Sequence, residues 1–150
     1  MVKRALLPYV VAAVLVVLAG GPVAAQCKAS PGAPLDDSYS PAAPKRAVVG
    51  SGLVVTGTIR ASSDCLPIAG ATVEYWMAGP NGYTEKLRGT VVTDKNGRYR
   101  FQCPFPVSHG FSPHIHMNVA GDAFLPIQTE FFPAQGSTSG SYDVVLDPAD

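Results

Sequence analysis

All three histidines of this 150-residue chain lie within eight residues of one another, at His109, His114 and His116. A single residue, Ile115, separates the last two, and alternate side chains of a β-strand point to the same face. His114 and His116 would then face the same way, and two neutral imidazoles on one face can share a metal ion. The alternative is ordinary packing or solvation on a strand, so the metal hypothesis needs further ligands elsewhere in the chain.

The first residues predict export. Two basic residues precede an apolar run over residues 5–19, and small residues follow up to Ala25. This order is typical of a signal peptide cleaved after Ala25, so residues 1–25 are expected to be removed and the mature protein secreted. A lipoprotein acylated at Cys27 and a retained membrane anchor are the alternatives. Gln26 argues against the first and the shortness of the apolar run against the second.

Composition excludes several classes of function. Cleavage would leave 125 residues, enough for one domain with a hydrophobic core. It would remove two of the eleven basic residues and none of the eleven acidic ones, giving a net charge of −2. With no basic stripe, no nucleic-acid partner is expected, and no membrane contact after signal cleavage. The chain also lacks a nucleophile constellation and a phosphate-binding glycine loop, which excludes hydrolase and nucleotide-enzyme functions.

The three cysteines are interpreted in an oxidising compartment. Cys65 and Cys103 stand at the edges of the expected domain and form a plausible disulfide, whereas Cys27 lies alone before the domain. The odd number leaves the pairing open. The spacings fit no structural zinc motif.

Residues 26–47 are rich in Pro and Ala and contain almost no large apolar side chain, so we expect a disordered linker there. Residues 48–150 should form one domain. Seven short apolar or alternating runs in it are separated by turn residues: 53–59, 71–76, 88–93, 98–103, 114–119, 124–132 and 142–146. They predict an antiparallel β-sandwich of about seven strands, with a tight hairpin at Asn96-Gly97.

Several short motifs follow one another along these runs. In order they are Gly57-Thr58-Ile59, Pro67-Ile68-Ala69-Gly70-Ala71, Gly82-Tyr83, Asp94-Lys95-Asn96-Gly97-Arg98-Tyr99-Arg100-Phe101 and His114-Ile115-His116. Each motif alone occurs in many β-sandwich modules. In this order, over residues 53–146, the chain resembles the catalytic domain of the intradiol ring-cleavage dioxygenases.

The resemblance implies an activity and a cofactor. Family members cleave catechol-type rings between the two hydroxylated carbons, with a non-haem ferric ion held by two tyrosinates and two histidines. In this chain the resemblance places iron on Tyr83, His114 and His116, although Tyr83 follows Trp76 one residue sooner than expected. Hard anionic phenolates favour Fe(III) over Fe(II). The implied substrates are O2 and small aromatic diols, of plant or lignin origin for example.

Two departures from the family pattern fall just before the paired histidines. Residues 101–113 contain no second tyrosine, and the family's arginine is also missing, with Phe111 or Ser112 in its neighbourhood. His109 stands near the place of the missing tyrosine, where it could bind the metal and accept a substrate proton. A site with one tyrosinate would carry one negative charge fewer, which favours Fe(II) or lets copper or zinc compete.

The working hypothesis is one mononuclear site made of Tyr83, His109, His114 and His116, in which Tyr83 and His109 are also the catalytic candidates. The alternative for Tyr83 is an ordinary turn aromatic, and for His109 a solvent-exposed loop residue. Two functions remain: a secreted iron dioxygenase acting on catechol-type diols, or a lapsed β-sandwich that binds metal, catechol or a surface partner. The tyrosine and paired histidines favour the first, and the missing tyrosine and arginine favour the second.

Overall fold

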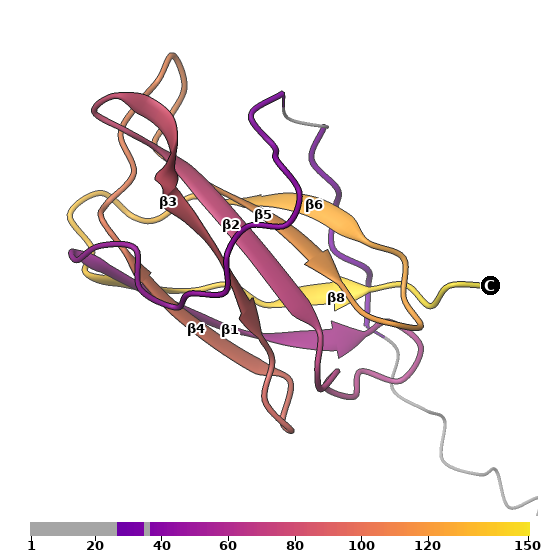
Figure 1. Cartoon of the computed structure of the whole chain (residues 1–150). Helices are drawn as coiled ribbons and strands as arrows, with labels where there is room; N and C mark the ends of the chain where they lie inside the picture. Colours follow the sequence, from indigo (N-terminus) through magenta and orange to yellow (C-terminus); the bar gives the residue numbers. More distant parts are fainter. Residues whose placement is uncertain (1–26, 35–36) are drawn as a thin grey trace, which may run out of the picture.

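The computed structural model describes residues 27–34 and 37–150, so the signal peptide expected at residues 1–25 lies outside the described part. Two β-sheets pack face to face (Figure 1). The strands are β1 (Leu53–Ala61), β2 (Thr72–Gly79), β3 (Gly82–Val92), β4 (Arg98–Cys103), β5 (Ile115–Ala120), β6 (Ile127–Phe131), β7 (Ser139–Ser141) and β8 (Val144–Leu146). One sheet has the order β4-β1-β7, with β8 also paired to β1, and the other has the order β3-β2-β5-β6. The predicted β-sandwich is confirmed.

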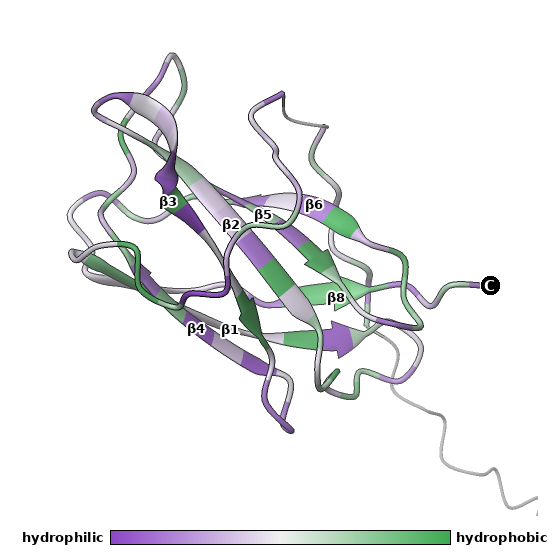
Figure 2. Cartoon of the chain, in the orientation of Figure 1, coloured by the Kyte–Doolittle hydropathy of each residue, from purple (hydrophilic) through white to green (hydrophobic). Residues whose placement is uncertain are grey.

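The core forms because the strands turn alternate side chains inward: β1 and β4 bury every second residue, and Figure 2 shows hydrophobic and hydrophilic bands along the strands. Tyr75 of β2 and Phe101 of β4 join the two sheets, with stacked rings 3.9 Å apart at 6°. The Tyr75 ring passes over Gly89 on the neighbouring strand, where a Cβ would lie 2.6 Å from the tyrosine oxygen. Its hydroxyl donates to the Arg46 carbonyl oxygen at 2.9 Å. Within the described residues, no helix is long and apolar enough to span a membrane.

The last predicted strand, residues 142–146, is shortened in the structure to β8, and the short strand β7 precedes it. β7 and β8 pair with β1 separately, and both run parallel to it, so the sandwich has eight strands and is not wholly antiparallel. The Asp143 carboxylate accepts the backbone N–H of Thr58 at 2.8 Å. A side chain therefore takes the place of a backbone acceptor between the two short strands.

The predicted Asn96-Gly97 turn forms, but the hairpin expected around it is wrong. The Asp94 carboxylate accepts the backbone N–H groups of Asn96 and Arg98, and the pKa of Asp94 is lowered by the bond from Arg98 above all. Gly97 adopts a φ of 69°, which favours glycine. The flanking strands then separate, because β3 pairs with β2 whereas β4 pairs with β1. The turn connects the two sheets.

The described residues before the domain, 27–34 and 37–47, differ from the disordered linker that was expected. We call them the N-terminal strap. In Figure 1 they appear as two indigo pieces: the first runs beside β6 and β8, and the second crosses β2 and β3. The Ala33 backbone N–H donates to the Gln128 carbonyl of β6, and Lys45 forms a parallel bridge with Thr90 of β3. Composition predicted disorder because the strap buries little apolar surface. Hydrogen bonds to the sheets position it instead.

The disulfide joins Cys27 to Cys65, so the pairing of Cys65 with Cys103 is wrong. Cys27 donates its backbone N–H to Ser62, which brings it next to the turn that follows β1. Cys103 is the last residue of β4 and its side chain lies in the core, fully buried. Burial raises the pKa of the Cys103 thiol to about 12, so it has little thiolate for disulfide chemistry.

We predict that the disulfide stabilises the fold by holding the strap to the end of β1. The double variant Cys27→Ser/Cys65→Ser should lose about 2–4 kcal/mol of unfolding free energy, because the unfolded chain regains the entropy of an open loop. Denaturant unfolding of the oxidised proteins measures this difference. Reduced wild type should match the double variant, and equal stability of the oxidised wild type and the double variant would contradict the prediction.

Candidate metal centre

β5 holds one of the two paired histidines directly. Ile115 and Met117 are fully buried in the core, so His116 between them must point to the outer face of the sheet. It pairs with Trp76 on β2 and with Glu130 on β6. Directly opposed residues share a face, so Trp76, His116 and Glu130 form one row across the outer face. His114 lies just before β5, two residues from His116, as the alternation predicts.

Tyr83 reaches the same face from β3. Trp76 pairs with Arg88, but Ala78 pairs with Tyr83, so residues 84–87 of β3 bulge out opposite the single residue Met77. On the N-terminal side of this bulge, Tyr83 lies opposite Ala78, which is on the same face as Trp76. Its side chain therefore points toward the paired histidines and not into the core.

The donor atoms of three predicted site residues converge at His116. His116 Nε2 lies 2.9 Å from His114 Nε2 and 3.0 Å from the Tyr83 hydroxyl oxygen. Metal–ligand bonds of about 2.1 Å place neighbouring ligand atoms roughly 3 Å apart when the angle between them is near 90°. The spacing thus fits a shared metal ion, and an imidazole–imidazole–phenol donor set suits iron, copper or zinc.

The positions available to the protons of the two imidazoles also favour a cation between His114 and His116. His114 Nδ1 lies 2.7 Å from the Ser112 carbonyl oxygen, so this nitrogen donates and His114 Nε2 presents a lone pair to His116. If His116 Nε2 donates to it, the lone pair of His116 Nδ1 faces the Glu130 carboxylate 3.6 Å away. If His116 Nδ1 carries the proton, two lone pairs meet. A second proton on His116 or a metal ion at the Nε2 atoms removes this conflict.

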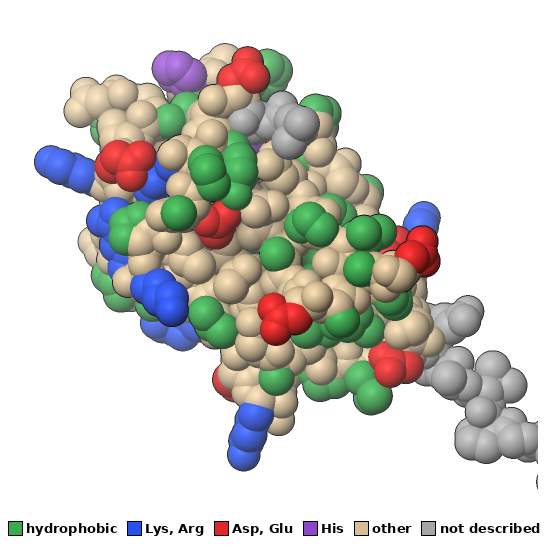
Figure 3. Space-filling view, turned by 45° about the vertical axis from the view of Figure 1, so that its right-hand side comes forward, with side chains coloured by type: hydrophobic (Ala, Val, Ile, Leu, Met, Phe, Trp, Pro, Cys, Tyr) green, Lys and Arg blue, Asp and Glu red, His purple; other side chains and the backbone are tan. Residues whose placement is uncertain are grey.

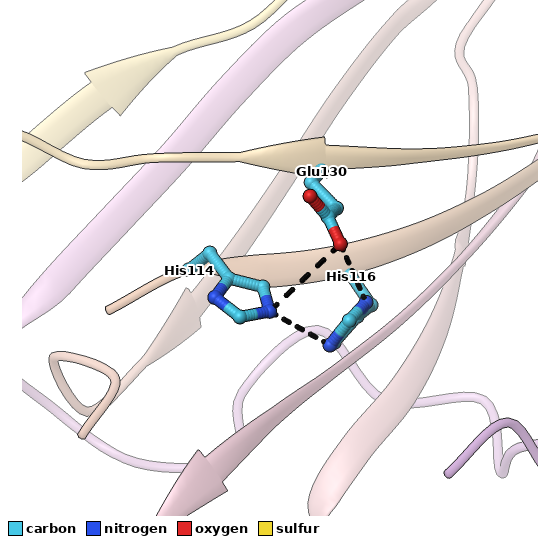
Figure 4. Close-up of side chains that lie close together, drawn as sticks. All are labelled: His114, His116 and Glu130. Carbon is cyan, nitrogen blue, oxygen red and sulfur yellow. Dashed lines mark hydrogen bonds and ion pairs between the residues drawn. The ribbon is translucent and has the colours of Figure 1, made fainter. Parts of the chain in front are cut away.

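Glu130 is the acidic residue that the sequence analysis missed. Among the described residues, one group of His, Cys, Asp and Glu side chains is close enough to hold an ion, and it consists of His114, His116 and Glu130. Figure 4 shows the two imidazoles and the carboxylate pointing toward one another, with Glu130 Oε1 4.0 Å from His114 Nε2. The alternation of 124–132 and its pairing with 114–119 could have placed Glu130 opposite His116.

The ring of His116 is held in place by Trp76. Trp76, which was expected in the core or in a pocket wall, stacks on it with centroids 5.2 Å apart at 10°. The Trp76 indole N–H donates to the Ser38 hydroxyl at 2.9 Å, and Arg88 donates to the Ser38 carbonyl at 3.0 Å. The strap thus fixes the tryptophan, and the tryptophan limits the orientation of His116.

A second polar row lies beside the first under the strap. Glu74 accepts hydrogen bonds from the Tyr39 hydroxyl at 2.7 Å and from Asn118 at 3.1 Å. It also accepts from the backbone N–H groups of Ala42 and Ala43. Burial and the bond to Glu74 raise the pKa of Tyr39 to about 12, so Tyr39 stays a neutral donor. Glu74 therefore anchors the strap and, through Asn118, the strand that carries His116.

All four predicted site residues line one open cavity of about 680 Å³. The cavity is also lined by Glu130, Ser112 and three apolar residues: Pro34, Phe111 and Phe132. Phe111 and Phe132 are exposed, and the Phe132 ring lies 5.3 Å from that of His114. Exposed histidine, acidic and hydrophobic side chains share this end of the molecule in the space-filling view (Figure 3).

His109 is set apart from the other three. It is exposed on the loop between β4 and β5, and its ring lies edge-on to Tyr83 with centroids 6.3 Å apart. It lines the cavity but is not part of the group of side chains close enough to share an ion. Its role as a metal ligand stays a prediction. The described lining residues include no second tyrosine and no Lys or Arg.

Several dioxygenases are similar to this chain in sequence. The chain is 28% identical over 125 residues to the chlorocatechol 1,2-dioxygenase of Pseudomonas sp. strain P51, covering 65% of this chain and 45% of that protein. It is 29% identical over 109 residues to catechol 1,2-dioxygenase 1 of Acinetobacter lwoffii, and this match covers 53% of this chain and 35% of that protein. The chain thus spans less than half the length of these curated relatives. No family model matches it.

The fold has a counterpart of the same size. The intradiol ring-cleavage dioxygenase of Tetranychus urticae superposes with a TM-score of 0.69 at 18% identity, covering 83% of this chain and 97% of that one. In sequence and in fold, the chain is similar to the intradiol ring-cleavage dioxygenase family, as a distant relative. This family uses non-haem Fe(III), and the site residues present here fit such an ion in spacing and donor type.

We predict that the metal centre depends on His114. His114→Ala removes the Nε2 atom nearest His116 and should abolish stoichiometric metal binding, as measured by metal analysis after loading and desalting. Asn96→Ala, in the exposed turn between the two sheets, is the control and should bind as the wild type does. Retained stoichiometric binding by a folded His114→Ala variant would rule out this centre.

Proposed function

We propose that this chain is a mononuclear non-haem iron dioxygenase that uses O2 for intradiol cleavage of catechol-type aromatic diols. One observation carries the proposal. In a shared cavity, His116 Nε2 lies 3.0 Å from the Tyr83 hydroxyl and 2.9 Å from His114 Nε2, in a chain whose sequence relatives are catechol dioxygenases. Two other cavities lined by described residues contain no histidine.

Different residues of the cavity would bind the metal, orient its ligands and contact the substrate ring. Tyr83, His114 and His116 would hold Fe(III), which when bound accepts a diol and draws electron density from its ring. The bond between His114 Nδ1 and the Ser112 carbonyl keeps the ligating Nε2 unprotonated. Phe111 and Phe132 provide apolar surface for an aromatic ring.

Proton transfer has two candidate acceptors in the same cavity. A diol that binds a metal through both oxygens must lose its hydroxyl protons. His109 at the rim and the Glu130 carboxylate both face the space where such a substrate would lie. We assign the first proton to His109 Nδ1 or Nε2, because the exposed ring can exchange it with water.

A binding module is the second candidate function. The specific observation that favours it is the cavity lining, in which the described residues supply neither the second tyrosine nor the arginine of the family. Such a protein would bind a metal or a catechol at the same residues without consuming oxygen.

We also propose that the protein is secreted. The basic, apolar and small-residue segments over residues 1–25 support this, and so does the Cys27–Cys65 disulfide, because disulfides persist in oxidising compartments.

Oxygen consumption separates the two candidate functions. The iron-loaded protein with catechol should consume one O2 per ring and yield a muconate-type diacid, and it should show a tyrosinate-to-iron absorption band that shifts when catechol binds. Tyr83→Phe should lose the band and lower turnover by more than about 100-fold, because the anionic ligand is gone. A shift of the band without oxygen uptake would instead support the binding module.

The cavity should also discriminate substrates by charge. Glu130 lies in it, and the described lining residues include no Lys or Arg. A catechol that carries a ring carboxylate should therefore bind at least about fivefold more weakly than catechol itself at low salt. Competition titrations against the absorption band measure the ratio, and equal affinities would contradict this account of the cavity.

A further inference from the structure

We propose that Glu130 supplies the second negative charge of the metal centre and so gives the site its preference for Fe(III) over divalent ions. The inference rests on the proposed function, because it concerns the same centre. It assigns to a residue of β6 the electrostatic part that the missing tyrosine would otherwise play.

The position of Glu130 is fixed by the sheet. β6 pairs with β5 in a register that sets Glu130 directly opposite His116, and the residues on either side of it, Thr129 and Phe131, are buried. Its side chain is 31% exposed, so the carboxylate is partly withdrawn from water. The carboxylate is therefore held beside the histidines by strand pairing and does not depend on a mobile loop.

The charge of Glu130 is directed at the centre. Its Oε1 atom lies 3.6 Å from His116 Nδ1 and 4.0 Å from His114 Nε2. In the described part of the chain, the ion pairs recorded for Glu130 are with these two histidines and none is with Lys or Arg. A positive charge at the histidines, whether carried by protons or by a bound metal ion, would therefore lie within 4 Å of this carboxylate.

A count of ligand charges explains the preference. Tyr83 as phenolate contributes one negative charge, neutral His114 and His116 contribute none, and Glu130 contributes a second. The sum is two, the same as for two tyrosinates. Hard anionic oxygen groups lower the energy of a trivalent ion more than that of a divalent ion, because attraction scales with the product of the charges.

His109 does not supply this charge. A neutral imidazole adds no negative charge, and the His109 ring is exposed and 6.3 Å from the Tyr83 ring. The proton-accepting role proposed for His109 and the charge role of Glu130 are thus separate, and different substitutions test them.

The experiment compares Glu130→Gln with wild type and with Asp122→Asn. The first substitution keeps the size of the side chain and removes its charge, whereas Asp122 lies exposed in the turn between β5 and β6 and does not line the cavity. Chelator competition gives the Fe(III) and Zn(II) affinities of each full-length protein, and a redox titration gives the iron potential. Thermal unfolding of the metal-free proteins verifies that each variant is folded.

For Glu130→Gln we expect Fe(III) affinity to fall by about 10–100-fold and Zn(II) affinity by a smaller factor. The ratio of the two affinities should fall about tenfold, and the Fe(III)/Fe(II) potential should rise. Asp122→Asn should leave the ratio within about twofold of wild type.

The opposing outcomes are distinguishable. Equal losses of Fe(III) and Zn(II) affinity, or an unchanged potential, would show that Glu130 only positions His116 and would overturn this inference alone. Unchanged Fe(III) affinity in Glu130→Gln would overturn it as well. A wild-type protein that binds Zn(II) but no Fe(III) would contradict the proposed function itself.

Discussion

The register of β5 between β2 and β6 is the constraint on which the rest of the site depends. Ile115, Met117 and Val119 are completely buried, so a slip of one residue would move three core side chains into water and His116 into the core. The hydrophobic effect therefore fixes which side chains face outward and which residues lie opposite them. The row of Trp76, His116 and Glu130 follows from core packing and needs no specific interaction among its own members to form.

This register alone would leave the outer face of the sheet exposed to solvent, but the strap covers part of that face. Ser38 and Tyr39 cover Trp76 and Glu74, and His116 is 7% exposed although it points away from the core. Lower effective dielectric around the ring strengthens its interaction with any cation. The strap contributes almost no apolar surface, so its hydrogen bonds and the Cys27–Cys65 link must offset the entropy lost in ordering it. Different interactions thus stabilise the fold and the site: burial of apolar side chains stabilises the sheets, whereas hydrogen bonds and the disulfide hold the strap.

The sequence predicted what local periodicity encodes. Alternation gave the β-sandwich and the common face of His114 and His116, and Asp94 shapes the turn that Asn96-Gly97 indicates. The features it missed are non-local. Glu130 joins the site because β6 pairs with β5. The strap is positioned by hydrogen-bond partners far along the chain. The strands on either side of the Asn96-Gly97 turn, β3 and β4, lie in different sheets. Cys65 is bonded to a partner that composition assigned to a free linker, whereas Cys103 points into the core.

The two sides of the centre differ in how firmly they are held, and this bears on function. His116 lies in a strand that is paired on both sides, with Trp76 stacked on its ring, whereas Tyr83 precedes the bulge at 84–87 in an edge strand and His114 precedes β5. A ligand at the end of an element can shift more easily than one inside it, because fewer backbone hydrogen bonds restrain it. Exchange of ligands in the proposed catalytic cycle would therefore have room on the side of Tyr83 and His114, where the Phe132 ring also lies beside His114. Under the proposed function, a centre with one rigid and one adaptable side would keep its metal in place while a diol enters, and the core packing of β5 would provide the rigid side.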